Sequence, residues 1–344
     1  MSSTLLRRLA LFAAAAILLT ACGGDDSSGG SRTLRLGCFP NVTHAPALVG
    51  IQEGIFADAL GPDVKLELSY FNAGPEGIES LFSGAVDATF IGPNPAINGY
   101  AQSNGEAVRI IAGSTSGGAF LVVRPGIESV QDLVGTTLAT PQLGNTQDVA
   151  LRAWLVDQGL SFDTAGGGDV SIWPQSNADT LNAFKIGDID GAWVPEPWAT
   201  RLIQEGGGVV LVDERDLWPD GAYVTTHLIM STTFLEENPD LVQDLLRGLI
   251  EAVRFTNENP AEAQRDVNDA IEDITSARLP DQVIAGAWEN LTFTWDPIAS
   301  SLQESADDAV AAGLLDPVDL SGIYALDILN RLLAEAGEAA VAGL

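Results

Sequence analysis

The sequence is poor in cysteine, histidine and basic side chains. Its 344 residues include 2 Cys, 2 His and 16 Lys or Arg, against 47 Asp or Glu, so the formal net charge is −31 at pH 7. So acidic a chain is poorly suited to bind nucleic acid or to dock on anionic lipid. The sequence has no zinc-ligand spacing, no phosphate-binding glycine loop and no convincing Ser-His-Asp set. We therefore expect no metal, no cofactor and no nucleic-acid partner.

The N-terminal segment has the order of an export signal. Two arginines precede an apolar run over 9–19, which is too short to span a bilayer comfortably. The following LTAC at 19–22 resembles a bacterial lipobox, although an ordinary signal peptide could also contain an incidental cysteine. A lipobox implies that 1–21 is a lipoprotein signal peptide, that Cys22 is acylated, and that the Gly/Ser/Asp-rich 22–32 is a lipidated flexible tether. The protein would then be exported and anchored by lipid to the outer face of the cytoplasmic membrane.

Cleavage at this point changes the charge and the thiol content of the chain. Removal of Arg7 and Arg8 leaves 14 basic and 47 acidic groups, a net charge of −33. Cys38 is then the remaining free thiol, so no internal disulfide can form. Because Cys38 lies in the apolar run TLRLGCF, we expect it to be buried in a strand rather than to act as a nucleophile.

The rest of the chain is 46% hydrophobic overall and too long for one typical core, which suits two domains. Short apolar runs alternate with amphipathic stretches, a pattern that predicts an α/β architecture with parallel sheets and helical crossovers. The first series gives strands at 33–39, 64–71, 85–92 and 107–114, with helices at 45–56, 74–84 and 95–102. The second gives strands at 119–125, 137–140, 169–175, 188–194 and 208–213, with helices at 146–159, 178–187 and 197–206. After about residue 230 we expect helices only.

One device occurs in both series. The segments DATFIGPNPAINGY and DGAWVPEPWATRL each run from an aspartate through an apolar strand to a Pro-x-Pro loop and a helix. Gly84 precedes Asp87 by three residues, as Gly187 precedes Asp190, and a glycine suits the left-handed turn that ends a helix. Chance could supply the Gly-x-x-Asp alone, but with the attached Pro-x-Pro we favour a structural correspondence between two lobes.

The Pro-x-Pro loops predict where two helices begin. Proline is favoured at the first helical position, so Pro95 and Pro197 would start helices and Asn94 and Glu196 would be their N-caps. Glutamate is not a preferred N-cap, which suggests that the carboxylate of Glu196 has another role. Loops at the carboxyl ends of strands form the ligand crevice of open α/β sheets, and helix starts bind anions. The alternative is that these loops contain only well-capped helices.

These residues carry a resemblance to a known family. From LRLGCFPNVTHAPALVGIQEGIF to WVPEPWATRL, the chain resembles the substrate-binding lipoproteins of ABC importers for nitrate, aliphatic sulfonates and taurine, whose superfamily includes binders of thiamine pyrimidine precursors. The resemblance covers nearly all of the mature chain, and GPNPAI, GNTQDVALRAWL and VPEPW are its most specific pieces. It implies a type II periplasmic-binding-protein fold, in which two crossing strands join two α/β lobes around a ligand cleft.

The resemblance also implies a domain division and partners. Lobe 1 would contain 33–117 and 227–344 and lobe 2 would contain 118–226, with crossings near 117–123 and 222–230. The C-terminal helices would return to lobe 1. A monomer of this kind would close on a small-molecule ligand and deliver it to an ABC permease driven by a cytoplasmic ATPase.

Site residues follow from the resemblance, residue by residue. Hydroxyl and amide groups would bind the polar part of a ligand, and Phe39, Trp193 and Trp198 would line its apolar part, although Trp193 could equally be core because it lies inside a strand. The candidates are Phe39, Asn41, His44, Gly74, Pro75, Glu76, Pro93, Asn94, Ser114, Thr115, Gln142, Asn145, Thr146, Trp193, Glu196, Trp198, Thr225, Thr226 and His227. No residue is assigned a catalytic role.

The residues leave several ligands open. Sulfonate or nitrate suits helix starts and needs no lysine, while Arg35, Arg152 and Arg201 are each as compatible with the surface as with the site. A carboxylate at Glu196 would instead favour an amino sulfonate such as taurine, or a thiamine pyrimidine precursor. We expect an aliphatic sulfonate or taurine first, with nitrate, bicarbonate or a pyrimidine as alternatives. An enzyme resembling thiamine-pyrimidine synthases is disfavoured, because the clustered cysteines of that branch are absent.

Overall fold

The structure is a computed structural model that describes residues 32–163 and 167–344. The expected signal peptide, Cys22 and nearly all of the tether lie outside the described residues. Within the part of the chain that is described, no helix is both long and apolar enough to cross a membrane.

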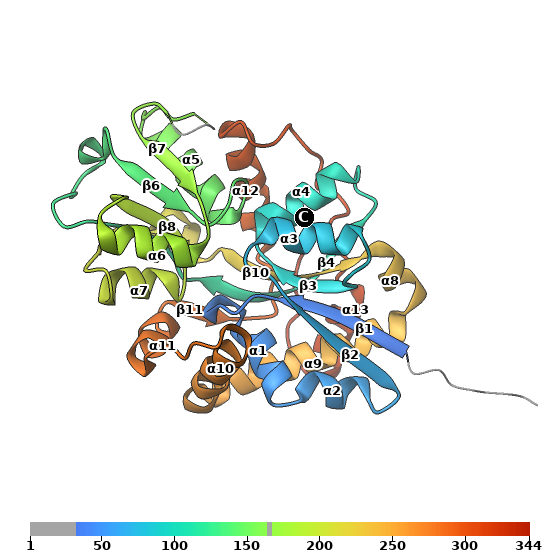
Figure 1. The fold of residues 1–344 in the computed structure, drawn as a ribbon. Helices are drawn as coiled ribbons and strands as arrows, with labels where there is room; N and C mark the ends of the chain where they lie inside the picture. The colour runs from blue at the N-terminus through green and yellow to red at the C-terminus, as the bar shows by residue number, and fades with distance from the viewer. Residues whose placement is uncertain (1–31, 164–166) are drawn as a thin grey trace, which may run out of the picture. The chain divides into compact units, whose positions relative to one another are not determined.

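The first sheet has six strands in the order β11-β4-β10-β3-β1-β2 (Figure 1). Strand β1 pairs in parallel with β2 and β3, whereas β10 runs antiparallel to β3 and β4, and β11 antiparallel to β4. The strands are β1 (Arg32–Cys38), β2 (Val64–Tyr70), β3 (Ala88–Ile91), β4 (Val108–Gly117), β10 (Val224–Ser231) and β11 (Leu291–Phe293). Between them lie η1 (Val42–His44), α1 (Ala45–Gln52), α2 (Ile55–Leu60), α3 (Gly74–Phe82) and α4 (Pro93–Gln102). We call this sheet and these helices lobe 1.

The second sheet has five strands in the order β7-β6-β8-β5-β9. Strand β6 is parallel to β7 and β8, and β5 runs antiparallel to β8 and β9. The strands are β5 (Ala119–Val123), β6 (Thr137–Thr140), β7 (Ser171–Pro174), β8 (Gly191–Pro195) and β9 (Val209–Asp213). Its helices are η2 (Val130–Leu133), α5 (Thr146–Asp157), α6 (Asn177–Ile186), α7 (Trp198–Gln204), η3 (Glu214–Leu217) and η4 (Pro219–Gly221). We call this second group lobe 2.

The prediction of parallel sheets was incomplete, because each sheet contains antiparallel strands. The chain leaves the first sheet at Gly117, enters the second at Ala119, and returns to the first as β10 from Val224. The crossing strands β5 and β10 therefore enter each sheet from the other lobe and run against its parallel strands. An apolar run in a sequence indicates a buried strand but not its direction, which is why the pattern alone missed this.

The C-terminal segment is mostly helical, as expected. It contains α8 (Thr232–Glu237), α9 (Pro239–Glu258), α10 (Pro260–Thr275), α11 (Asp281–Trp288), α12 (Ala299–Ala311) and α13 (Asp327–Glu335). Helices α9 and α10 pack on α1, and α13 packs on α9, whereas α11 and α12 also contact α7 and α5 of lobe 2. The expectation of helices only was wrong at β11, whose three residues are too few to show a strand pattern.

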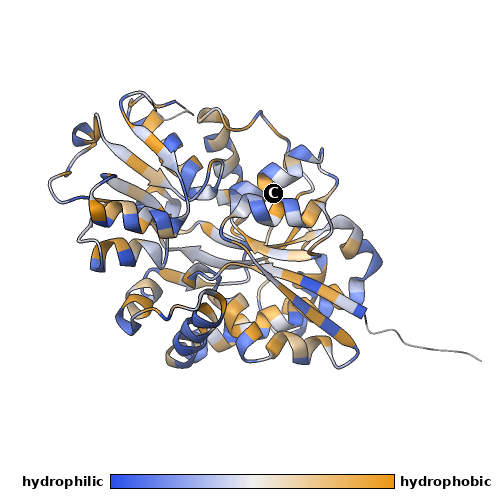
Figure 2. Cartoon of the chain, viewed as in Figure 1, coloured by the Kyte–Doolittle hydropathy of each residue, from blue (hydrophilic) through white to orange (hydrophobic). Residues whose placement is uncertain are grey.

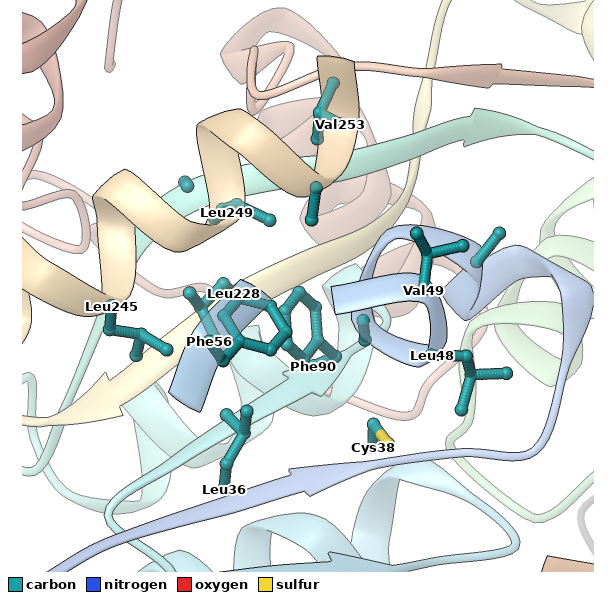
Figure 3. Packing of buried hydrophobic residues seen from close by; sticks show 14 of the residues in the cluster. Leu36, Cys38, Leu48, Val49, Phe56, Phe90, Leu228, Leu245, Leu249 and Val253 are labelled. Atoms are coloured by element: carbon teal, nitrogen blue, oxygen red, sulfur yellow. The ribbon is translucent and has the colours of Figure 1, made fainter. Parts of the chain in front are cut away.

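The largest core cluster of lobe 1 includes residues of β1, α1, α2 and α9 (Figure 3), and a second cluster includes residues of α3, α4 and α12. Leu36 and Cys38 on β1, Phe56 on α2 and Leu249 on α9 belong to the first cluster, and all four are fully buried. Figure 2 shows apolar residues along the strands, whereas α10 presents a mostly hydrophilic face. The prediction that Cys38 is a buried strand residue is confirmed, and burial raises the pKa of its thiol to about 12.

The repeated device forms the same structure in each lobe. Gly84 and Gly187 have positive φ angles of 70° and 94° after the helices α3 and α6, as the sequence predicted. Asp87 Oδ2 accepts a 2.8 Å hydrogen bond from the backbone N–H of Arg35, and the N–H of Asp87 donates to the carbonyl of Arg35 at 2.8 Å. Asp190 exchanges the same two bonds with Thr137, both at 2.8 Å. Each aspartate thus joins the loop before one strand to the neighbouring parallel strand, which confirms the structural correspondence.

The predicted helix starts were wrong by one or two residues. Helix α4 begins at Pro93 with Gly92 as its N-cap, so Asn94 lies inside the first turn. Helix α7 begins at Trp198 with Pro197 as its N-cap. Proline is favoured at the start of a helix, but α4 begins at the first proline of its loop and α7 begins after the second, so the prolines alone do not fix the first helical residue.

Candidate functional site

A small cavity lies where the strand-end loops of the two lobes meet. Its volume is about 30 Å³, which is room for about two water molecules. It is lined by Phe39, Asn41, Thr43, His44, Asn72, Gly92, Asn145, Thr146, Gln147, Asn177, Pro195 and Thr225. In lobe 1 most of these residues follow β1, β2 and β3, and Thr225 is the second residue of β10. In lobe 2 they follow or end β6, β7 and β8. The carboxyl ends of parallel strands are where ligands bind in α/β sheets.

A larger hollow exists on the surface but lacks these features. Its volume is about 680 Å³, and it lies between the end of α4 and residues 314–321. Residues of lobe 2 do not line it, and it is not at the carboxyl ends of the parallel strands. We therefore take the smaller interlobe cavity as the candidate site, because position and chemistry distinguish it better than size.

Lobe 1 contributes an aromatic and uncharged wall. The rings of Phe39 and His44 are stacked with their centroids 4.4 Å apart, and His44 Nδ1 accepts a 3.4 Å hydrogen bond from the backbone N–H of Phe39. Burial lowers the pKa of His44 to about 3, so its imidazole is neutral at physiological pH. With Nδ1 as the acceptor, the neutral ring carries its proton on Nε2.

Lobe 2 contributes polar groups at two helix starts. Asn145 is the N-cap of α5, and its Oδ1 accepts from the backbone N–H of Thr146 at 2.8 Å. Thr146 Oγ1 and Asn177 Oδ1 are both buried and have no hydrogen-bond partner among the described residues. Thr146 opens the twelve-residue helix α5, whose dipole places partial positive charge at this end. A hydroxyl without a partner at such a helix start is suited to donate to an anion.

The two lobes contact each other around the cavity. Trp198 Nε1 in α7 donates a 3.0 Å hydrogen bond to Asn41 Oδ1 in lobe 1. Gly92 faces Thr146 so closely that a Cβ at position 92 would overlap Thr146 Oγ1. The lobes are therefore closed on each other, and a ligand larger than a few atoms can enter only if they separate.

The walls of the cavity carry no Asp, Glu, Lys or Arg among the residues that the structure describes, and the imidazole of His44 on the wall is neutral. Of the candidate cations, Arg35 forms an ion pair with Asp87 at 2.5 Å and Arg201 with Glu205 at 2.7 Å, and both are away from the cavity. Arg152 is fully buried in α5 and its Nε donates to Asp148 Oδ2 at 2.9 Å. No cluster of three or more potential metal ligands occurs in the described part of the chain.

The interpretation of Glu196 as a cleft carboxylate is not supported by its position. Glu196 is fully buried, and it is not on the cavity wall. Its carboxylate accepts from Thr200 Oγ1 at 2.8 Å, from the Thr200 N–H at 3.1 Å and from Asn290 Nδ2 at 2.8 Å. Burial raises the pKa of Glu196 against these hydrogen bonds. The peptide bond between Glu196 and Pro197 is cis.

The structure brings six of the predicted site residues to the cavity wall. They are Phe39, Asn41, His44, Asn145, Thr146 and Thr225. Their binding roles stay predictions.

The other predicted residues do not line the cavity. They are Gly74, Pro75, Glu76, Pro93, Asn94, Ser114, Thr115, Gln142, Trp193, Glu196, Trp198, Thr226 and His227. Trp193 packs in the core of lobe 2 against Trp154, and its Nε1 donates to Glu214 Oε2 at 2.7 Å. Asn94 donates to the carbonyl of Ser305 at 2.9 Å. The side chains of Trp193 and Asn94 thus point to protein partners, which strand and loop position alone does not reveal.

Three of these predicted residues have hydrogen-bond partners, and two of the bonds are to residues that line the cavity. Thr226 Oγ1 donates to the carbonyl of Thr43 at 2.9 Å, and Thr43 lines the cavity. His227 Nε2 is 3.0 Å from the carbonyl oxygen of Pro297, and burial lowers the pKa of His227 to about 4. Glu76 accepts from the backbone N–H of Asn72 at 3.0 Å and so orders another lining residue.

Six lining residues were missed from the sequence. They are Thr43, Asn72, Gly92, Gln147, Asn177 and Pro195. Five lie in the first few residues after a strand and Pro195 ends one, so a rule taking every such position would have found them. Gly92 and Pro195 carry no polar side chain, and only the approach of the other lobe explains their place on the wall.

Two layered α/β lobes with paired crossing strands and a polar cavity between them define a two-lobed binding protein. A family model described as the NMT1-like family matches residues 27–271, and the chain belongs to this family. The alkanesulfonate-binding protein SsuA from Xanthomonas axonopodis pv. citri has a similar structure, with a TM-score of 0.71 and 20% identity over 86% of this chain and 98% of that one. This likeness confirms the periplasmic-binding-protein fold that the sequence predicted.

Two relatives are similar in sequence as well. The taurine-binding periplasmic protein of Escherichia coli (strain K12) is 28% identical over 218 residues, which cover 62% of this chain and 64% of that protein. The bicarbonate-binding protein CmpA of Synechococcus sp. (strain ATCC 27144 / PCC 6301 / SAUG 1402/1) is 25% identical over 258 residues, covering 68% and 56%. The chain thus matches less than two thirds of the length of either relative.

Proposed function

We propose that this protein is the solute-binding lipoprotein of an ABC importer and that it captures a small organic anion of the aliphatic sulfonate type. The proposal is supported by the family, by the names of its relatives and by the two-lobed fold. Export with a lipid anchor at Cys22 is part of the proposal, as are a monomeric state and a permease partner with its ATPase. Capture requires binding and closure only, and we assign no residue a catalytic role.

The start of helix α5 is the feature that supports an anionic ligand. Thr146 Oγ1 lies there, buried, on the cavity wall and without a partner among the described residues. Amide groups of Asn145, Gln147 and Asn177 surround it, and no carboxylate shares the wall. An oxyanion would receive hydrogen bonds and a favourable helix dipole here without meeting a fixed negative charge.

Among small anions, the residues that line the cavity favour a sulfonate with a short apolar part. The stacked rings of Phe39 and His44 offer an apolar surface in lobe 1, opposite the polar helix start in lobe 2. An alkanesulfonate has these two ends. Because Glu196 lies off the cavity, the structure gives no reason to prefer an ammonium group, so taurine has no advantage over simple alkanesulfonates.

Nitrate or bicarbonate is the second candidate, favoured by the cavity volume of about 30 Å³. Such compact anions require less separation of the lobes than a sulfonate with a carbon chain. A thiamine pyrimidine precursor is less favoured, because the described wall lacks a carboxylate to receive its ring or amino N–H groups.

Closure would couple binding to transport. A ligand that contacts both lobes stabilises the closed arrangement, so binding shifts the population from open to closed. The permease would then distinguish the loaded protein by the arrangement of its lobes.

A thermal-shift and calorimetry panel tests this function. Methanesulfonate, ethanesulfonate, taurine, nitrate, bicarbonate and a thiamine pyrimidine would be titrated into the purified protein. We expect sulfonates to raise the melting temperature most and to bind one per chain. Binding restricted to pyrimidines, or turnover of any of these compounds, would contradict the proposal.

A further inference from the structure

A buried ion pair lies directly behind the helix start that faces the cavity. Asp148 is in the first turn of α5 and Arg152 is one turn further on, and both side chains are fully buried. Arg152 Nε donates to Asp148 Oδ2 at 2.9 Å. An isolated buried charge is costly, so a fully buried pair in a helix whose start lines the cavity calls for an explanation.

Asp148 orders the loop that precedes α5. Its Oδ1 accepts from Thr140 Oγ1 at 2.8 Å, and its Oδ2 accepts from the backbone N–H of Gly144 at 2.9 Å. Gly144 is followed at once by Asn145 and Thr146, which line the cavity. The carboxylate therefore holds the anion-facing helix start in place, but its negative charge also lies close to where an anion would bind.

Arg152 supplies the opposite charge at the same place. Side chains of a helix point back toward its N-terminus, and residues four apart are separated by only about 6 Å along the axis. The guanidinium thus lies beside the first turn, and its Cζ atom is 5.3 Å from the centroid of the Phe162 ring. Nη1 and Nη2 are buried and have no hydrogen-bond partner among the described residues. Among the described residues, the guanidinium therefore has its ion pair with Asp148 and its ring contact with Phe162, and Nη1 and Nη2 add no further hydrogen bond.

We propose that Arg152 is a positioning residue whose charge cancels that of Asp148, so that Asp148 can order the start of α5 without repelling an anion in the cavity. The inference rests on the proposed function, since it requires an anionic ligand. Coulomb interactions between buried charges are weakly screened, so neither salt nor a surface residue can substitute for this compensation. The pair thereby leaves no net charge behind the helix start, so that the helix dipole and its hydrogen-bond donors can attract an anion although the described cavity wall carries no Lys or Arg.

The test measures the dissociation constants of methanesulfonate and nitrate by calorimetry for the full chain and four variants. Arg152→Met removes the charge and leaves Asp148 uncompensated, and we expect the constants to rise at least about tenfold. Arg152→Lys retains the charge but not the planar fork, and should retain most of the affinity. In the double variant Asp148→Asn with Arg152→Met neither charge remains, and the affinity should recover to within about threefold of the wild type. Arg247→Met, a control at a pair with Glu335 that is about half exposed, changes the net charge equally and should have no effect.

The outcomes separate this inference from the proposed function. If the wild type binds no anion, the proposed function fails and the inference falls with it. If the wild type binds but Arg152→Lys is as weak as Arg152→Met, or the double variant does not recover, only the inference is overturned. Should Arg152→Met fail to fold, Arg152→Gln takes its place in the single and the double variant, with the same expected loss and recovery of affinity.

Discussion

Lobe 1 and lobe 2 each place three parallel strands beside an antiparallel crossing strand, in the orders β2-β1-β3-β10-β4 and β7-β6-β8-β5-β9. Asp87 and Asp190 make equivalent bonds in the two sheets. The cavity walls differ nonetheless. Lobe 1 offers the stacked rings of Phe39 and His44, while lobe 2 offers the helix starts at Thr146 and Asn177. One backbone plan thus supplies both walls of the cavity, and the residues after each strand give the two walls different chemistry.

The Pro-x-Pro loops show the same divergence. In lobe 1, Asn94 donates to the carbonyl of Ser305 on α12. In lobe 2, the carboxylate of Glu196 binds Thr200 on α7 and Asn290 near the C-terminal helices. Both loops therefore connect a lobe to the C-terminal segment. The contact is made by the side-chain amide of Asn94 in lobe 1 and by the buried carboxyl group of Glu196 in lobe 2.

The largest effect is expected when buried titratable groups of the two lobes are compared for their contribution to stability at different pH. Burial lowers the pKa of His227 in lobe 1 to about 4 and raises the pKa of Glu214 in lobe 2 to about 7. Between pH 6.5 and 4.5 unfolded chains bind more protons at His227, so acidification removes stability there. At Glu214 the folded state binds more protons between pH 7 and 4.5, so acidification adds stability.

Urea unfolding at pH 7.0 and 4.5 checks this opposition in two variants. When the pH falls from 7.0 to 4.5, the free energy of unfolding of His227→Gln should decrease by about 3 kcal/mol less than that of the wild type. The free energy of unfolding of Glu214→Gln should decrease by about 3 kcal/mol more than that of the wild type. Differences of the same sign in the two variants would show that the lobes do not titrate in opposite senses.

The equivalent aspartates give the next effect. Asp87→Ala should lower the free energy of unfolding by about 3 kcal/mol, because its carboxylate is almost fully buried and also pairs with Arg35. Asp190→Ala should cost about 1 to 2 kcal/mol, since it removes the bond to Thr137 but no ion pair. The exposed Asp188→Ala is the matched control and should change stability by less than about 0.5 kcal/mol. Urea unfolding of the three variants measures these changes in free energy. An equal change at all three positions would contradict the structural correspondence between Asp87 and Asp190.

The contact between Gly92 of lobe 1 and Thr146 of lobe 2 tests closure itself. A Cβ at position 92 would overlap Thr146 Oγ1, so Gly92→Ala should hold the lobes apart. We expect ligand affinity to fall at least about tenfold, with little change in unfolding free energy. Small-angle scattering with saturating ligand should show less compaction than the wild type. Normal affinity and compaction would mean that the lobes close without this contact.

The smallest effect is expected at Glu196. Because its carboxylate lies off the cavity, Glu196→Gln should change the affinity for any anion by less than about twofold. Calorimetry with methanesulfonate and taurine measures this, and a selective loss for taurine would restore the carboxylate to the binding site.

The sequence predicted the alternation of strands and helices well, because buried strands such as β1 and amphipathic helices such as α3 have distinct periods. It also predicted the repeated device, since Gly84 and Gly187 are needed where φ is positive. It did not predict β11, the directions of the strands, or the helix starts at Pro93 and Trp198. These features depend on contacts with segments that are distant in the sequence.

The site was predicted at the level of loops rather than side chains. Five of the six candidates that line the cavity do so because residues after strands converge there, whatever their identity, and Thr225 lies at the start of β10. The direction of each side chain depends on tertiary partners. Trp193 turns toward Glu214 and Glu196 toward Asn290, and neither partner is adjacent in the sequence. The buried pair of Asp148 and Arg152 was visible as an i, i+4 spacing, but its burial was not.

Calorimetric titration of the wild type and of Thr146→Val with methanesulfonate tests the central claim most directly. Thr146 Oγ1 has no partner among the described residues, so the substitution should leave the unfolding free energy nearly unchanged. We predict one site per wild-type chain and a dissociation constant about tenfold higher in Thr146→Val, the loss of one hydrogen bond to a charged ligand. Equal affinity in the two proteins would contradict the account, because the anion would then not bind at the start of helix α5.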